Sequence, residues 1–151
     1  MSPGFFFTWK LPTFPPIINM DYMKAGKPVL AVILATAWIS SSEFVRNQFL
    51  LSSYWTAHYR EMGLVFPARP LNGAIWGLWS MMLAVCIFIL SRKFSLISTT
   101  LIAWIMGFVM MWLVIGNLSV LPCGILVYAI PLSLLEALVA TVIVRQLRVR
   151  E

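Results

Sequence analysis

A single carboxylate, Glu136, lies inside an otherwise apolar run near the end of the chain, in the stretch PLSLLEALVAT. A charge in hydrocarbon is costly, so an ionisable residue in such a run marks either an ion or proton pathway or a polar contact between helices. Residues expected at a similar depth elsewhere carry hydroxyl groups or a thiol but no basic group. We therefore expect Glu136 to be protonated, to face other helices and to donate a hydrogen bond. The predicted intramembrane polar site consists of Glu136, Ser133, Thr100 and Thr36.

A second group of polar residues lies near the end of the first apolar segment, in SSSEFVRNQFLL. Glu43 and Arg46 are three residues apart, so on a helix they share one face and can pair. Counted from Lys27, Glu43 lies about 24 Å along the helix, close to the outer interface, whereas Glu136 lies nearer the middle. We therefore expect no salt bridge between Glu136 and this group, which either lines an outer pocket or is solvated. The predicted outer polar site consists of Glu43, Arg46, Asn47, Asn72, Asn117, His58 and Glu61.

Metal chemistry and catalysis find little support in the sequence. His58 and Glu61 have a His-x-x-Glu spacing that occurs among metal ligands, but His58 is the only histidine, and zinc and di-iron sites need more ligands. The sequence also lacks a phosphate-binding loop, a serine nucleophile elbow and an HExxH motif. We accordingly predict no metal, no cofactor and no enzymatic activity.

The composition is that of a membrane protein. Of the 151 residues, 61% are hydrophobic and 11% charged, against about 45–50% and about 25% in soluble domains. A chain of this length accommodates about four helical spans of about 20 residues with short loops. We predict an all-α integral membrane protein, a four-transmembrane-helix bundle, with the lipid bilayer as a partner.

Four apolar segments are long enough to cross a membrane, and none alternates with the period of a barrel strand. They form one membrane domain, residues 28–151, after a flexible tail rich in proline and aromatic residues, residues 1–27. Between the first two segments, the aromatic stretch from Ser52 to Pro70 predicts a short interfacial helix that ends at Gly63. The predicted spans are residues 28–51, 72–90, 94–115 and 124–144.

The distribution of basic residues predicts an orientation. With four spans, most Lys and Arg residues fall on the side that holds both termini, so the positive-inside rule places both termini in the cytoplasm, and we expect the bacterial cytoplasmic membrane. The rule also accounts for the net charge of +6, so no nucleic-acid partner is predicted. The start of the first span mimics a signal peptide, but its apolar run continues past the small-residue site, so we expect it to be retained.

Every predicted span carries small residues at spacings of three, four or seven, which allow helix backbones to approach each other in lipid. We expect these stripes, including the GxxxG of Gly73 and Gly77, to pack within one chain, with pairing of copies through the remaining small faces as a further possibility. The stripes are Ala31, Ala35 and Ser42; Gly73, Gly77, Ser80 and Ala84; Ser95, Thr99, Ala103 and Gly107; and Ala129, Ser133, Ala137 and Thr141.

Two functions follow from these residues. The first is a non-catalytic accessory or assembly component of a larger membrane complex, in which Glu136 makes an internal hydrogen bond. The alternative is a small homo-oligomeric proton-coupled transporter or channel, in which Glu136 is the coupling carboxylate and the outer polar site lines the mouth. The sequence names neither a substrate nor a partner protein.

Overall fold

The structure, a computed structural model, describes residues 21–149, and every regular element in that range is helical. Two short segments, η1 and η2, are π-helical, and η3 is a 3-10 turn. The elements are α1 (Asp21–Val45), η1 (Arg46–Leu50), α2 (Ser52–Glu61), α3 (Pro70–Leu90), α4 (Leu96–Trp104), η2 (Ile105–Val109), α5 (Met110–Asn117), η3 (Cys123–Ile125) and α6 (Leu126–Val149).

Within residues 21–149, four helices are long and apolar enough to cross a membrane, which confirms the predicted all-helical class. These helices cover Gly26–Leu50, Pro70–Leu90, Leu96–Asn117 and Cys123–Leu147. Their bounds lie within a few residues of the predicted spans. The short helix predicted between the first two spans is α2, which is followed by Gly63 at a φ of 72°.

The predicted N-terminal tail needs a correction. Residues 1–20 lie outside the described residues, whereas residues 21–27 form the first turns of α1 instead of a tail. The helix continues through Pro28, at which the sequence-based span began. A proline removes one backbone hydrogen bond, and that loss does not end a helix whose neighbouring turns are intact.

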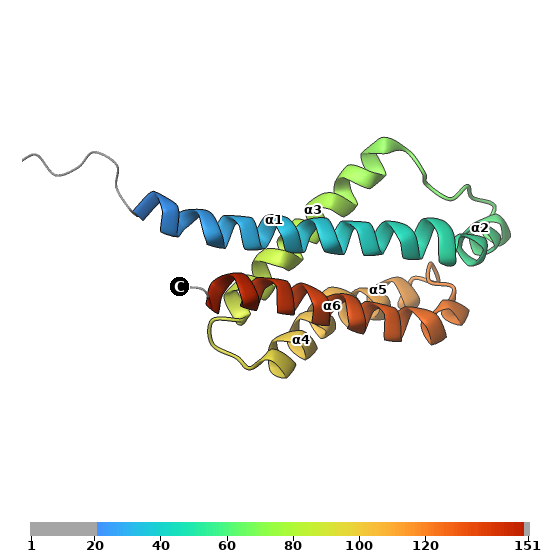
Figure 1. The fold of residues 1–151 in the computed structure, drawn as a ribbon. Coiled ribbons are helices and arrows are strands. Elements are labelled where there is room, and N and C mark those ends of the chain that lie inside the picture. Colours follow the sequence, from blue (N-terminus) through green and yellow to red (C-terminus); the bar gives the residue numbers. More distant parts are fainter. Residues whose placement is uncertain (1–20, 150–151) are drawn as a thin grey trace, which may run out of the picture.

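The helices α1 and α6 lie side by side and run in opposite directions (Figure 1). Helix α3 packs against α1, and α4 packs against α6. The N-terminal end of α1 and the C-terminal end of α6 lie at the same end of the molecule, on the left in Figure 1, and α2 lies at the opposite end, which we call the α2 end. This arrangement fits an even number of spans, while the side of the membrane that each end faces stays a prediction.

Small residues account for much of the helix packing. Ala31 and Ala35 of α1, Ala84 of α3 and Ala103 of α4 are buried, as is the whole predicted stripe of α6. The expectation that the GxxxG of α3 packs within the chain is wrong, because a Cβ added at either of its two glycines would meet no atom within 4 Å. The reason is geometric: the first turns of α3 project beyond the other helices in Figure 1.

Gly107 is the glycine at which a close approach matters. A Cβ at this position would lie 3.1 Å from both δ-carbons of Leu83 and 3.6 Å from the Trp79 ring. Next to it, Phe108 is fully buried and makes edge-to-face contact with Trp79 at 5.4 Å between ring centroids. Gly107 thus lets η2 approach α3 and fixes the position of Phe108.

We expect Gly107→Leu to lower the free energy of unfolding by about 1–3 kcal/mol, the usual cost of overpacking a filled interior. The measurement is thermal unfolding of the purified protein in detergent, followed by circular dichroism. Gly26→Leu is the matched control, because Gly26 is also helical but has nothing within 4 Å of an added Cβ. Equal unfolding temperatures for the two variants would contradict the tight contact.

Candidate functional site

Arg46 lies between two carboxylates inside the helix assembly. Its Nη1 donates to Oε2 of Glu136 at 3.0 Å, and its Nη2 donates to Oε1 of Glu43. The residues Glu43, Arg46 and Glu136 are 4%, 5% and 2% exposed, so water is almost excluded from all three. We call these three residues the charge cluster. It joins α1 and η1 to α6.

The pairing of Glu43 with Arg46 confirms the sequence-based expectation, but the expectation that Glu136 would form no salt bridge is wrong. Counted from the α2 end, Arg46 lies four residues inside the span Gly26–Leu50, and Glu136 lies thirteen residues inside the span Cys123–Leu147. At 1.5 Å per residue, Glu136 is therefore roughly 13 Å deeper than Arg46. Side chains of a helix tilt toward its N-terminus. On the antiparallel pair α1 and α6, that tilt directs Arg46 and Glu136 toward each other, and the long arginine covers most of the remaining separation.

The π-helical segment η1 adjusts which residues face the interior after Arg46. On a regular helix, the buried face would continue three or four residues later, yet Phe49 and Leu50 are 67% and 57% exposed. Leu51 is buried instead, and its N–H donates to the carbonyl oxygen of Arg46 at 2.8 Å. The wider turn therefore keeps Arg46 inward while the chain leaves the interior toward α2. Such π-helical turns often occur at functional sites.

A second π-helical segment, η2, supplies the surface beneath the guanidinium group. The Cζ atom of Arg46 lies 5.2 Å from the ring centroid of Phe108, a cation–π distance. The Phe108 ring in turn contacts the rings of Trp79 and Trp112. Arg46 is thus fixed by two carboxylates at its edges and by an aromatic ring at its face.

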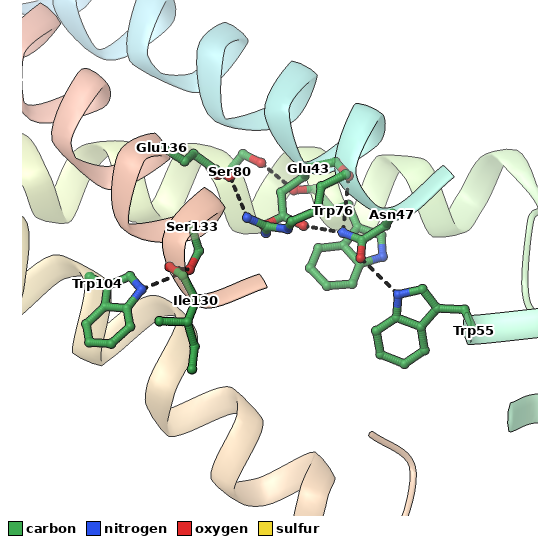
Figure 2. Close-up of polar contacts among 10 residues, drawn as sticks. Glu43, Asn47, Trp55, Trp76, Ser80, Trp104, Ile130, Ser133 and Glu136 are labelled. Carbon is green, nitrogen blue, oxygen red and sulfur yellow. Dashed lines mark hydrogen bonds and ion pairs between the residues drawn. The ribbon is translucent and has the colours of Figure 1, made fainter. Parts of the chain in front are cut away.

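Asn47 and Trp55 connect the charge cluster to α2 (Figure 2). Nδ2 of Asn47 donates to Oε2 of Glu43 at 2.6 Å, and Nε1 of Trp55 donates to Oδ1 of Asn47 at 3.0 Å. Trp55 also stacks on Phe66 in the following loop, with ring centroids 6.0 Å apart. The position of the Glu43 carboxylate is therefore coupled to the aromatic segment at the α2 end.

The carboxylate of Glu136 is only partly hydrogen-bonded. Its Oε1 atom is buried and has no hydrogen-bond partner among the described residues, while its backbone carbonyl accepts a bond of 3.1 Å from Nε1 of Trp38. Buried polar atoms are nearly always paired, so an unpaired carboxylate oxygen calls for an explanation such as a proton, a water molecule or a ligand.

The other members of the predicted intramembrane site do not join Glu136. The Ser133 hydroxyl accepts from Trp104 Nε1 at 2.9 Å and donates to the carbonyl oxygen of Ile130, as Figure 2 shows. Thr36 donates within its own helix, and the Thr100 hydroxyl is buried without a partner in the described chain. No hydrogen bond in residues 21–149 links these three side chains to Glu136.

The predicted outer site is divided. Glu43, Arg46 and Asn47 come together in the interior, whereas His58 Nε2 lies 3.0 Å from the carbonyl oxygen of Ser119. Glu61 is 78% exposed, with its Oε2 4.0 Å from His58 Nδ1. For the remaining two members, Asn72 and Asn117, the described chain shows no side-chain hydrogen bond to the charge cluster.

A groove of about 290 Å³ adjoins the charge cluster between α1 and α6. Sequence reasoning missed it, because it depends on how two helices far apart in the sequence pack against each other. Its residues are Trp38, Ser41, Ser42, Val45, Arg46, Leu50, Leu132, Leu135 and Glu136. The wall of the groove is almost entirely apolar, and the unpaired Oε1 of Glu136 is buried behind it.

Comparison with known proteins gave no relative from which a function could be carried over. No protein-family model matches the chain, and no significant match was found among curated proteins or among solved structures. The site itself therefore carries the functional argument.

The charge balance of the cluster limits its chemistry. With both carboxylates ionised, Glu43, Arg46 and Glu136 carry a net charge of −1 in a region of low dielectric constant. A surplus charge of this kind is expensive unless a proton or a cation neutralises it. The cluster is thus suited to binding one positive charge.

We expect Arg46→Met to lower the free energy of unfolding by about 3 kcal/mol or more, because it leaves two buried carboxylates without a cation. The measurement is chemical unfolding of the purified protein in detergent near neutral pH. Adding Glu43→Gln and Glu136→Gln to Arg46→Met should recover most of the loss, because the uncompensated charges are then gone.

Arg60→Met serves as the matched control, because Arg60 is an exposed arginine of α2. This change should leave the unfolding free energy within about 0.5 kcal/mol of the unmodified protein. If Arg46→Met proves as mild as Arg60→Met, Arg46 does not bridge buried carboxylates.

Proposed function

We propose that this chain is a small proton-coupled membrane transporter without catalytic activity, in which Glu136 alternates between a proton and a positively charged substrate. The observation that carries the proposal is the buried carboxylate oxygen of Glu136 that has no partner, in a cluster with two carboxylates and one guanidinium group. The same proposal includes the bacterial cytoplasmic membrane as the location of the chain. It also includes cytoplasmic termini, as expected from the basic flanks.

The presence of two carboxylates beside one arginine supports the exchange of a proton for a cation over a purely structural contact. One carboxylate is enough to neutralise Arg46 and to hold α1 against α6. The second one adds a negative charge that must be compensated inside the protein, and proton pathways in membranes are built from such ionisable groups. A group that accepts either a proton or a substrate cation, but not both, couples the movements of the two.

Few other charges influence Glu136. From α1 and η1, the facing groups are Glu43 and Arg46, and the spans Pro70–Leu90 and Leu96–Asn117 contain no charged residue and no histidine. In α6, Arg145 lies near the opposite end and donates to the carbonyl oxygen of Phe94 at 2.9 Å. Glu43 and Arg46 are therefore the charged groups that act on Glu136.

A structural role is the second candidate, and the salt bridge between Arg46 and Glu136 favours it. Helices in lipid lack a hydrophobic driving force for association, so a charged contact between α1 and α6 would help to hold the pair together. In that case the protein is an accessory or assembly component of a larger membrane complex, and the cluster keeps one fixed protonation state.

Infrared spectroscopy of the protein in liposomes distinguishes these two candidates. When the pH is lowered stepwise from about 8 to about 5, proton coupling requires a carboxylic-acid C=O band that grows with acid and disappears in Glu136→Gln. Glu61→Gln is the matched control, because Glu61 is exposed and its replacement should leave that band unchanged.

An infrared spectrum without any pH-dependent band assignable to Glu136 or Glu43 would contradict proton coupling. Where a pH-dependent band is present, the same measurement on Glu43→Gln shows whether the proton binds Glu43 or Glu136. A band that Glu43→Gln removes and Glu136→Gln leaves would move the coupling role from Glu136 to Glu43.

A further inference from the structure

Three basic side chains meet at the end of the molecule opposite α2 (Figure 1). Arg92 and Lys93 are exposed in the short loop between α3 and α4. Arg145, near the end of α6, donates from Nη1 to the carbonyl oxygen of Phe94 at 2.9 Å, which places its guanidinium group beside that loop. We call Arg92, Lys93 and Arg145 the basic patch. It joins the loop to the end of α6.

The carboxylates of the described side chains lie away from the basic patch. Within residues 26–147, the range for which the structure describes side chains, the carboxylates are Glu43, Glu61 and Glu136. Glu43 and Glu136 belong to the charge cluster in the interior, and Glu61 lies at the α2 end. The basic patch therefore presents three positive charges whose counter-ions come from outside this range.

A row of exposed apolar side chains begins next to the basic patch. Ile97, Leu101 and Ile105 follow one another at spacings of four residues, so they share one side of their helix. They are 70%, 44% and 46% exposed, although they belong to the span Leu96–Asn117. At 1.5 Å per residue this row, which we call the apolar stripe, is about 12 Å long, close to half of a hydrocarbon core of about 30 Å. The apolar stripe therefore has the length of about one leaflet.

A phospholipid with an anionic headgroup matches both features. Basic side chains near a membrane surface attract anionic lipids, and guanidinium groups bind phosphate through paired, charge-assisted hydrogen bonds. The acyl chains of the same lipid begin just below its phosphate and can cover the apolar stripe. A free phosphate ion would leave the apolar stripe uncovered, and an acidic protein in water would not contact side chains within a span.

We infer that the basic patch and the apolar stripe together bind one anionic phospholipid, with its phosphate at the basic patch and an acyl chain along the apolar stripe. The hydrogen bond from Arg145 to Phe94 holds the loop against α6, so that the three charges lie at one headgroup. The inference goes beyond the proposed function, because it does not depend on proton exchange at Glu136.

Native mass spectrometry of the protein in detergent tests the inference. The probe is dioleoyl phosphatidylglycerol, and dioleoyl phosphatidylcholine is the comparison lipid with the same acyl chains and no net charge. We expect one bound phosphatidylglycerol at concentrations at which phosphatidylcholine binds little. Arg92→Gln combined with Lys93→Gln should weaken the binding of phosphatidylglycerol about 25-fold, roughly fivefold for each basic residue near an anionic surface.

Arg60→Gln combined with Arg69→Gln is the matched control. These two arginines are exposed and lie in α2 and in the loop that follows it. The control removes the same net charge, so a general electrostatic attraction would be weakened equally in both double variants. For a site at the basic patch, the control should bind phosphatidylglycerol as tightly as the unmodified protein does. All four replaced side chains are exposed, so neither double variant removes a buried contact.

The position of the acyl chain is the second measurement. In phosphatidylcholine liposomes, phosphatidylglycerol with a diazirine on one acyl chain should label residues 97–105, as located by mass spectrometry. The same diazirine on phosphatidylcholine should label lipid-facing residues without this preference. Arg92→Gln combined with Lys93→Gln should remove the preference of phosphatidylglycerol for residues 97–105.

Equal binding of the two lipids, or an equal loss of binding in the two double variants, would overturn the inference. Displacement of phosphatidylglycerol by inorganic phosphate at a similar concentration would also overturn it, because the basic patch would then bind a free anion. Phosphatidylglycerol that binds but labels residues outside 97–105 would show that its acyl chain does not follow the apolar stripe.

Discussion

The pairing of one guanidinium group with two carboxylates in a nearly dry interior is the constraint on which the structure depends. Each of these charges alone would be too costly in hydrocarbon, so Glu43, Arg46 and Glu136 must be brought together. They come from both ends of the chain, and their contact fixes α1 against α6. The remaining charge imbalance gives the contact a chemical use in addition to a structural one.

Several local features of the fold serve this contact. The π-helical turn after Arg46 keeps the arginine inward while the chain turns toward α2, and Gly107 allows a second π-helical turn to approach α3 and place Phe108 under the guanidinium group. Asn47 relays the position of Glu43 to Trp55. A change at the α2 end can therefore reach the charge cluster through two hydrogen bonds.

Composition and periodicity predict the helices of this protein well, because a span needs only length and apolar character. The contact between Glu43 and Arg46 is equally predictable from the sequence, because a spacing of three residues places both on one helix face. The bridge to Glu136 was not predictable from depth alone. It depends on the opposite directions of two packed helices and on the reach of an arginine. Likewise, the open face at Gly73 depends on the tilt of α3, which no local pattern encodes.

The most direct measurement is the distance from the Arg46 guanidinium nitrogens to the carboxyl carbons of both glutamates, by solid-state NMR in lipid bilayers. Glu43→Gln and Glu136→Gln assign the two carboxyl signals. Dipolar coupling of Arg46 to both carbons, at distances of about 4 Å, is expected for an arginine that hydrogen-bonds both carboxylates. Coupling to Glu43 alone would contradict the shared arginine, and with it the surplus charge on which the proposed transport depends.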